Sequence, residues 1–302
     1  MKLTIFTPTF NRAYTLGDLY ESLKRQTSKN FEWVVVDDGS TDDTEALVKK
    51  WIAEGAVDIV YKKQPNQGKH IAINTGVKIA TGELFFTVDS DDFLSPDATE
   101  KILSHWEKYG AGKENVSGII SYKRLKDGKF SGKLIPKEVQ YCTLRDATKK
   151  FDSRGDKVVL HRTDILRRYP YPQFEGEKFL GESYVYNQID DHYTMSVMDD
   201  AIYWFEYRSD GLSCDFRKLY RNNPKGFYLI FSQQTKYLTT VREKLKNAAH
   251  LDALAIRLGR WILEKPHCLW RFLALPLGIF LYFKIFVFKI SDVKLYLRGT
   301  KR

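Results

Sequence analysis

Residues 84–94 read LFFTVDSDDFL and place three aspartates directly after an apolar run. Leu84 to Val88 are bulky, β-compatible residues, and the run is too short for a helix, so we expect a buried strand. Ligands of open α/β sheets bind beyond the carboxyl ends of the strands, so we expect Asp89, Asp91 and Asp92 at the edge of a cleft. Close carboxylates repel one another, and a divalent cation shared with phosphate would relieve that repulsion. The alternative is an acidic turn that caps the next helix.

Strand and helix patterns alternate in the residues before this stretch. Apolar runs predict strands at 2–7, 31–36 and 57–62, and the segments between them predict helices at about 16–27, 42–54 and 70–81. This alternation implies parallel strands joined by right-handed crossovers. Polar residues follow the strands at Pro8-Thr9, at Asp37-Asp38 and at Asp89, and we expect these ends to lie side by side. Ala72, Gly76 and Ala80 recur every four residues, which predicts a helix that packs closely on a neighbour.

Four motifs in this order indicate a family. They are TPTFNR (7–12), VVVDDGSTDDT (34–44), NQGKHIAINTG (66–76) and ATGELFFTVDSDD (80–92). Together they resemble the inverting family-two glycosyltransferases of the GT-A fold, over about residues 1–110. The chain contains no Walker-type phosphate loop and no GxGxxG after the first strand, which excludes those nucleotide-binding classes.

The resemblance implies a donor site. Its nucleotide-sugar-binding residues would be Pro8, Thr9, Asn11, Arg12, Asp38, Asn66, Gly68, Lys69, Asn74, Asp89, Ser90 and Asp91. By this resemblance Pro8 and Thr9 line the nucleotide pocket, and Asp38 reaches the base. Asp89 and Asp91 match the DxD-type motif, in which one carboxylate lies near the ribose and Asp91 holds Mn²⁺ or Mg²⁺ on the diphosphate. Asp89 is the second candidate ligand of the metal, which neutralises charge on the departing nucleoside diphosphate.

The catalytic base is expected in residues 169–193, a segment rich in acids and aromatics. An inverting transferase needs a carboxylate that takes the proton from the acceptor hydroxyl. In the resembled family this residue belongs to a Glu-Asp pair at the start of a helix, and here the pair reads Glu182-Ser183. Glu182 is therefore the predicted base, with Glu177 and Asp191 in reserve. The alternative for Glu182 is a carboxylate that only stabilises the helix start.

The acceptor side shows weaker patterns. Strands are predicted at 116–122, 157–160 and 202–207, and a short helix at 144–151. The following turn contains Arg208 and Ser213, which either help to hold the leaving diphosphate or belong to a simple turn.

The net charge of +10 is unevenly distributed. Residues 215–302 hold 18 Lys or Arg against five Asp or Glu, whereas residues 1–214 carry a small net negative charge. A coat for nucleic acid would not be divided in this way, so no nucleic-acid partner is expected. Cys142, Cys214 and Cys268 lie far apart, which favours a reducing compartment and no zinc site. The start, MKLTIFTPTF, does not fit a signal peptide.

The C-terminal part reads as basic and helical from Pro224, with apolar residues crowded between 261 and 288. The longest uncharged piece, 272–283, is shorter than the roughly 20 residues that span a bilayer. Aromatic and leucine side chains flanked by Lys and Arg are typical of a segment that lies in the membrane interface. The alternative is a helical hairpin that packs on the catalytic domain or on a second copy in a homo-oligomer.

We therefore predict an α/β protein with a GT-A, Rossmann-like fold: a mixed, mostly parallel sheet flanked by helices, with a C-terminal helical extension. Residues 1–215 would form the catalytic domain, with a nucleotide-sugar half (1–110) and an acceptor half (111–215), and 216–302 a membrane-associating tail. The predicted enzyme moves a sugar from a nucleoside diphosphate sugar, with UDP favoured, to a hydroxyl of a lipid-linked glycan. The expected setting is cell-surface polysaccharide synthesis, such as capsule assembly.

The predicted location is cytoplasmic, on the inner face of the cell membrane. Two other hypotheses stay open: an inactive GT-A scaffold or glycan-binding protein, supported by the missing aspartate after Glu182, and a nucleotidyltransferase. The second would need a basic, Gly-rich loop after the first strand, and TPTFNR is not one.

Overall fold

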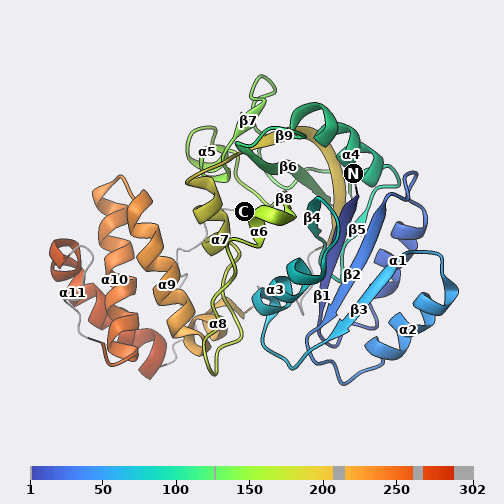
Figure 1. The fold of residues 1–302 in the computed structure, drawn as a ribbon. Coiled ribbons are helices and arrows are strands. Elements are labelled where there is room, and N and C mark those ends of the chain that lie inside the picture. Colours follow the sequence, from blue (N-terminus) through green and yellow to red (C-terminus); the bar gives the residue numbers. More distant parts are fainter. Residues whose placement is uncertain (1, 126, 207–214, 261–267, 289–302) are drawn as a thin grey trace. The chain divides into compact units, whose positions relative to one another are not determined.

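The computed structural model describes residues 2–125, 127–206, 215–260 and 268–288 (Figure 1). The described chain forms two compact units, 2–172 with 185–206 and 173–184 with 215–260 and 268–288. The predicted turn at Arg208 to Ser213 lies outside the described residues. The division predicted at residue 215 stays a prediction, and segment 173–184 groups with the C-terminal helices.

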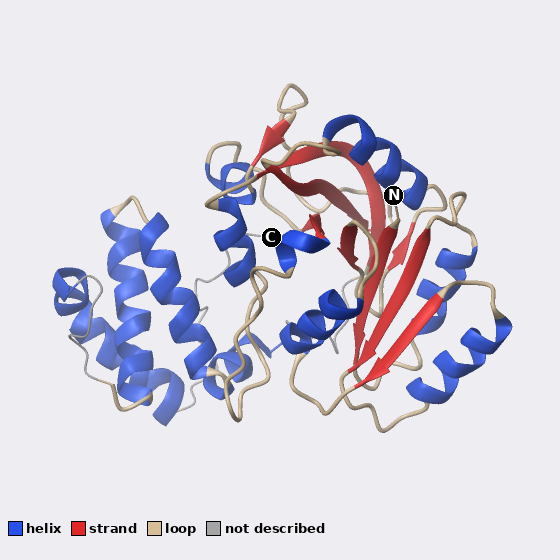
Figure 2. Ribbon diagram, viewed as in Figure 1, coloured by secondary structure: helices blue, strands red, loops and turns tan. Residues whose placement is uncertain are grey.

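The first unit is built on one mixed sheet of nine strands (Figure 2). The strands are β1 (Leu3–Thr9), β2 (Phe31–Asp37), β3 (Ile59–Lys63), β4 (Leu84–Thr87), β5 (Phe93–Leu94), β6 (Val116–Leu125), β7 (Tyr141–Cys142), β8 (Lys157–Arg162) and β9 (Thr194–Phe205). Their order is β3-β2-β1-β4-β8-β6-β9-β5, with β7 paired to β9. Strands β1 to β4 run parallel, β6 runs parallel to β9, and β8 is antiparallel to both of its neighbours. The predicted mixed α/β sheet is confirmed.

Helices connect the strands as the alternation predicted. They are α1 (Leu16–Lys24), α2 (Thr44–Glu54), α3 (Lys69–Ile79), α4 (Ala98–Tyr109), α5 (Leu144–Lys149) and α6 (Thr163–Leu166). Helix α7 (Ser183–Asp190) begins in the second unit and continues in the first.

The two faces of the parallel half are packed differently. On one face, Tyr20 of α1 stacks on Trp51 of α2 with ring centroids 4.3 Å apart, and both belong to the core cluster that contains Trp33 of β2. On the other face, α3 lies so close that a Cβ on Gly76 would be 2.3 Å from the ring of Phe6. The predicted close packing of the small residues is therefore confirmed at Gly76.

The carboxyl ends of three parallel strands form one rim. Strand β1 lies between β2 and β4, with Thr9 opposite Asp37 and Phe6 opposite Thr87. The loops after these strands therefore start side by side, as the sequence predicted. We call the residues at these three strand ends, together with the loop before α3, the rim.

The last strand differs from its prediction. Strand β9 begins at Thr194, eight residues before the predicted start at Ile202. The acidic pair Asp199-Asp200 hid this first half, because exposed acids broke the apolar pattern. The pairing of β6 with β9 is irregular between Ile120 and Tyr122, which accommodates that pair.

The second unit is helical. It contains α8 (Phe216–Asn222), α9 (Pro224–Gln234), the 3₁₀ turn η2 (Thr235–Tyr237), α10 (Val241–Arg257), α11 (Cys268–Tyr282) and the π-helical turn η3 (Phe283–Val287). Small residues let α10 and α11 approach closely, since a Cβ on Gly278 would lie 2.5 Å from Cβ of Asp252. Between these helices Nε of Arg271 donates to Oδ1 of Asp252 over 2.8 Å, and both side chains are buried.

One helical stretch of the described chain, Leu269–Val287, is long and apolar enough to cross a bilayer by length and composition. Its mean hydropathy is 1.6, and 22% of its apolar window is buried. The core helix of a soluble protein passes the same test, so this stretch is weak evidence for a membrane span. It is longer than the uncharged piece at 272–283 because it also includes the charged residues Arg271 and Lys284, which border that piece.

Candidate donor site

The acidic loop after β4 is held by hydrogen bonds to a tyrosine of β9. The hydroxyl of Tyr203 donates to Oδ2 of Asp92 over 2.6 Å and accepts a hydrogen bond of 3.0 Å from the backbone N–H of Asp89. Tyr203 and Asp92 are both buried. One phenol therefore fixes the two ends of the loop, and Asp91 lies between them.

Two lysines balance the charge of Asp89. Nζ of Lys69, at the start of α3, lies 2.6 Å from Oδ1, and Nζ of Lys123, on β6, lies 3.9 Å from Oδ2. Burial alone would raise the pKa of Asp89, but the two ammonium groups lower it to about 2. Asp89 is therefore a carboxylate at neutral pH.

The pKa of Asp92 is shifted in the opposite direction. Burial raises its pKa to about 7, although Lys123, at 3.7 Å, and the hydrogen bond from Tyr203 both lower it. Lys123 also lies over the ring of Tyr203, with Nζ 4.0 Å from the ring centroid. Strand register explains this grouping, because Lys123 and Tyr203 are directly paired between β6 and β9.

Asp38, after β2, holds the loop before α3. Its carboxylate accepts hydrogen bonds from the backbone N–H groups of Gln67 (2.9 Å) and Gly68 (2.7 Å) and from Nε2 of Gln64 (2.8 Å). Gly68 has φ = 96°, a conformation that favours glycine. The predicted contact of Asp38 with a base stays a prediction, and its observed contacts shape the loop that would pass over the nucleotide.

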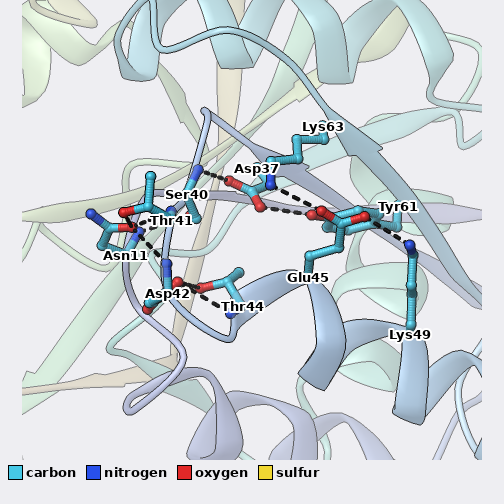
Figure 3. A network of polar contacts seen from close by, with 10 residues as sticks. All are labelled: Asn11, Asp37, Ser40, Thr41, Asp42, Thr44, Glu45, Lys49, Tyr61 and Lys63. Carbon is cyan, nitrogen blue, oxygen red and sulfur yellow. Dashed lines mark hydrogen bonds and ion pairs between the residues drawn. The ribbon is translucent and has the colours of Figure 1, made fainter.

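Asn11 joins the loops after β1 and β2 (Figure 3). Its backbone N–H donates to Oγ of Ser40 over 2.8 Å, and its Oδ1 accepts from the N–H of Thr41 over 2.8 Å. Asn11 has φ = 53°, and asparagine is among the few residues that adopt this region readily. In the same network Asp37 accepts from the Ser40 N–H (2.7 Å) and from the Tyr61 hydroxyl (2.7 Å).

The remaining predicted residues lie on the same rim or beside it. Thr9 is buried, and within the described chain its hydroxyl has no hydrogen-bond partner. Asn74 faces elsewhere, because its amide exchanges two hydrogen bonds with the backbone of Tyr171 (2.8 and 2.9 Å). The predicted donor-site residues on the rim are Pro8, Thr9, Asn11, Arg12, Asp38, Asn66, Gly68, Lys69, Asp89, Ser90 and Asp91.

Asp91 is a better candidate than Asp89 for a ligand of a metal ion. Its side chain is partly exposed, and no described residue forms a hydrogen bond or ion pair with it. Mg²⁺ is typically bound by one or two carboxylates together with substrate phosphates, so one open carboxylate on this rim suits such an ion. The described residues contain no group of three potential metal ligands.

The three candidate bases have different surroundings. Glu177, in the second unit, accepts from the backbone N–H groups of Lys225 (2.8 Å) and Gly226 (2.9 Å), and so caps the start of α9. Asp191, in the first unit, forms an ion pair of 2.9 Å with Arg145. Glu182, in the second unit, is partly exposed and directly precedes α7. Glu177 and Asp191, the second-choice candidates, therefore have structural roles, and the role of Glu182 as the catalytic base stays a prediction.

Sequence reasoning missed Lys123 and Tyr203. Both lie on strands that are far from residue 89 along the chain, and strand register alone brings them together. The only signal in the sequence is a lysine that follows the apolar run of β6.

Comparison with known proteins identifies a family. Residues 4–153 match the family described as Glycosyl transferase family 2. The match contains all three strand ends of the rim and Lys123 of β6. The family resemblance stated from the four motifs is confirmed.

Named relatives extend this finding. An uncharacterized glycosyltransferase of Rickettsia bellii is 30% identical over 153 residues, which are 47% of this chain and 21% of that protein. The Staphylococcus aureus poly(ribitol-phosphate) beta-N-acetylglucosaminyltransferase TarP is 34% identical over 142 residues, 46% and 40% of the two chains. The GalNAc(5)-diNAcBac-PP-undecaprenol beta-1,3-glucosyltransferase of Campylobacter jejuni is 31% identical over 187 residues, 60% and 56% of the two chains. The chain thus spans between a fifth and just over half of the length of these relatives.

Solved structures share the fold. S. aureus TarS 1-349 in complex with UDP-GlcNAc aligns with a TM-score of 0.61 and 21% identity, over 85% of this chain and 73% of that one. The mannosyltransferase PcManGT of Pyrobaculum calidifontis, in complex with GDP-Man and Mn²⁺, aligns with a TM-score of 0.54 and 16% identity, over 93% and 81%. These likenesses confirm the GT-A fold.

The buried Asp92 predicts a pH dependence of stability. Its folded pKa of about 7 lies above the unfolded value of about 3.9, so its stabilising contribution is complete below pH 4 and is lost as the pH rises through 7. Relative to the wild type, Asp92→Asn should gain unfolding free energy between pH 5 and 7, on the order of 1 kcal/mol per pH unit. Urea unfolding at several pH values measures this difference.

Asp97→Asn is the matched control. Its pKa is lowered by Ser95 and Lys101, so the carboxylate stays ionised over this range and the variant should differ from the wild type by a constant amount. Parallel pH profiles for Asp92→Asn and the wild type would contradict the assignment.

Proposed function

The chain belongs to glycosyl transferase family 2, and on that premise we propose that it transfers a sugar from a nucleoside diphosphate sugar to an acceptor hydroxyl with inversion. The observation that carries the proposal is the charge arrangement of the rim. Asp89 is neutralised by Lys69 and Lys123, whereas Asp91, two residues further along, is partly exposed and has no partner in the described chain. A site of this kind suits a diphosphate that brings a divalent cation with it.

The proposed donor is a UDP-sugar. TarS, a protein of the same fold, was solved with UDP-GlcNAc, and PcManGT with GDP-Man and Mn²⁺. The buried, unpartnered hydroxyl of Thr9 and the loop held by Asp38 supply polar groups where a nucleotide would bind. The choice between nucleotides is the first point for experiment.

The proposed chemistry divides between two sets of residues. Glu182 would take the proton of the acceptor hydroxyl as its oxygen attacks the anomeric carbon, so that the sugar-phosphate bond breaks from the opposite side. Lys69 would turn one of its hydrogen bonds toward the diphosphate, since an ammonium group has three donors. Asp91 would hold Mn²⁺ or Mg²⁺, which supplies a counter-charge for the leaving group.

The proposed acceptor is a lipid-linked glycan in cell-surface polysaccharide assembly. The name of the C. jejuni relative includes a PP-undecaprenol glycan, and its match covers more of this chain than those of the other two relatives. A lipid-linked acceptor also agrees with the surface of α11, because an enzyme that acts on it must work at a bilayer.

We further propose that α11 and η3 attach the protein to the inner face of the cell membrane. Seven of their exposed apolar side chains recur at helical spacing and form one stripe: Leu269, Phe272, Leu273, Leu277, Phe280, Phe283 and Val287. All seven side chains are apolar, and Nζ of Lys284 lies 5.2 Å from the ring centroid of Phe280. An apolar helix face of this length, with a basic segment beside it, is typical of interfacial attachment.

Donor binding should be visible as thermal stabilisation. MnCl₂ with UDP at a hundredfold its dissociation constant should stabilise the fold by about 2.7 kcal/mol, and GDP, dTDP and CDP should stabilise it less. In Asp91→Asn the metal-dependent part of the shift should disappear. Asp58→Asn, an exposed acid before the start of β3, is the control and should respond like the wild type. No shift with any nucleotide would favour an inactive scaffold.

Glu182→Gln should separate binding from chemistry. Loss of a general base typically costs about 10²–10⁴ in rate, so kcat should fall by that factor while the dissociation constant of the donor is unchanged. Single-turnover transfer and calorimetric donor binding measure the two quantities. Glu175→Gln, an exposed acid of the same segment, should retain full turnover. Full turnover in Glu182→Gln would remove this residue from the mechanism.

Two charges placed in the stripe should weaken membrane attachment. Phe272 and Phe280 are 64% and 56% exposed, so Phe272→Asp with Phe280→Asp should leave the fold intact. Each aromatic side chain withdrawn from the bilayer forfeits about 1.5–3 kcal/mol, so vesicle co-flotation should be lost. Ile52→Asp, at an exposed apolar position of α2, is the control and should float like the wild type. Flotation of the double variant would refute the proposal.

A further inference from the structure

The second unit contains a cavity of ≈ 190 Å³ between η2, the first three turns of α10 and the start of α11. Its lining residues are Thr235, Leu238, Lys244, Ala248, Leu251, Trp270 and Arg271. The wall therefore combines two cationic side chains, a hydroxyl and an indole with apolar side chains. This composition suits an anionic group that is joined to an apolar body.

Lys244 supplies the uncompensated charge of this cavity. Its Nζ lies 5.5 Å from the ring centroid of Trp270, and no carboxylate of the described chain lies within ion-pair distance of it. A cation held over an aromatic face keeps all of its hydrogen-bond donors for another partner. Arg271, in contrast, is paired with the buried Asp252, so its charge is already balanced.

The segment around the cavity is also positive. Residues 235–246 contain four cations, Lys236, Arg242, Lys244 and Lys246, and one acid, Glu243. The carboxylate of Glu243 accepts from the backbone N–H of Thr240 over 3.1 Å, as the N3 residue of a capping box. Glu243 is thus committed to the start of α10, and the potential near the cavity favours an anion.

The apolar stripe begins beside this cavity. Leu269 and Leu273 of the stripe flank Trp270 along α11, and they are 64% and 54% exposed. A ligand with its charged group in the cavity could therefore place an acyl chain along the stripe. A soluble phosphate has no acyl chain that could contact the stripe, whereas a membrane lipid has both a charged headgroup and an acyl chain.

We infer that this cavity binds the phosphate headgroup of an anionic membrane lipid, with Lys244 as the cation that recognises it. The inference rests on the membrane attachment proposed above and specifies it: the stripe provides affinity for the bilayer, and the cavity selects lipids that present an accessible phosphate. A phosphate monoester fits best, because it offers more charge and more acceptor oxygens to one ammonium group than a carboxylate does.

Vesicle binding of the full chain tests the inference. Phosphatidylcholine vesicles would be compared with vesicles that contain phosphatidic acid, or oleate at the same surface charge. The wild type should bind phosphatidic acid vesicles about tenfold more tightly than oleate vesicles. Lys244→Ala should lose this preference. Lys236→Ala removes the same charge from an exposed site outside the cavity, and should weaken binding to both anionic vesicles equally while keeping the ratio.

The outcomes separate the two proposals. Equal binding of the wild type to both anionic vesicles would contradict the proposed lipid site in the cavity but would leave the proposed membrane attachment intact. No binding to any vesicle would contradict both proposals. Thermal stabilisation by inorganic phosphate that is absent in Lys244→Ala, without a vesicle preference, would assign the cavity to a soluble phosphate and overturn the lipid. Equal melting temperatures of the two lysine variants without ligand would show that both are folded.

Discussion

The parallel pairing of β1 with β2 and β4 is the constraint on which the site depends. These strands are buried on both faces, so their backbone groups must pair with one another, and their polar residues can emerge only at the ends. Because the strands run parallel, three such ends meet on one rim. Asn11 and Asp38 then connect the loops of that rim to one another. The position of the candidate donor site is thus a consequence of strand direction before any side chain is considered.

Charge balance sets the character of that rim. Three acids in four residues would repel one another in a partly buried loop. Two lysines from different elements offset this repulsion. Lys69 comes from the start of α3 and Lys123 from β6, on the far side of β4 and β8. The result is unequal: Asp89 is ionised and paired, Asp92 is buried and held by Tyr203, and Asp91 is left open. The three aspartates therefore have different surroundings, on which their proposed roles rest.

Packing between the C-terminal helices determines which face of α11 is exposed. Small residues and the buried pair of Asp252 with Arg271 bring α10 and α11 together, which turns the large apolar side chains of α11 outward. A helix in a fully soluble protein would normally face the opposite way. The inner face of α11 therefore stabilises the unit, and its outer face is the one that we propose to contact a bilayer.

The sequence alone determined the strand-helix alternation, the family and most of the rim, because apolar period and turn chemistry are local properties and the motifs lie in the loops after the strands. It did not reveal the first half of β9, where Asp199 and Asp200 interrupt the apolar pattern, nor the commitment of Asn74 to Tyr171 and of Glu177 to α9. Only the tertiary structure decided that Lys123 and Tyr203 belong with the aspartates and that Lys244 and Trp270 share a cavity. These groupings depend on strand register and helix packing between residues far apart in the chain, and no local pattern encodes such distances.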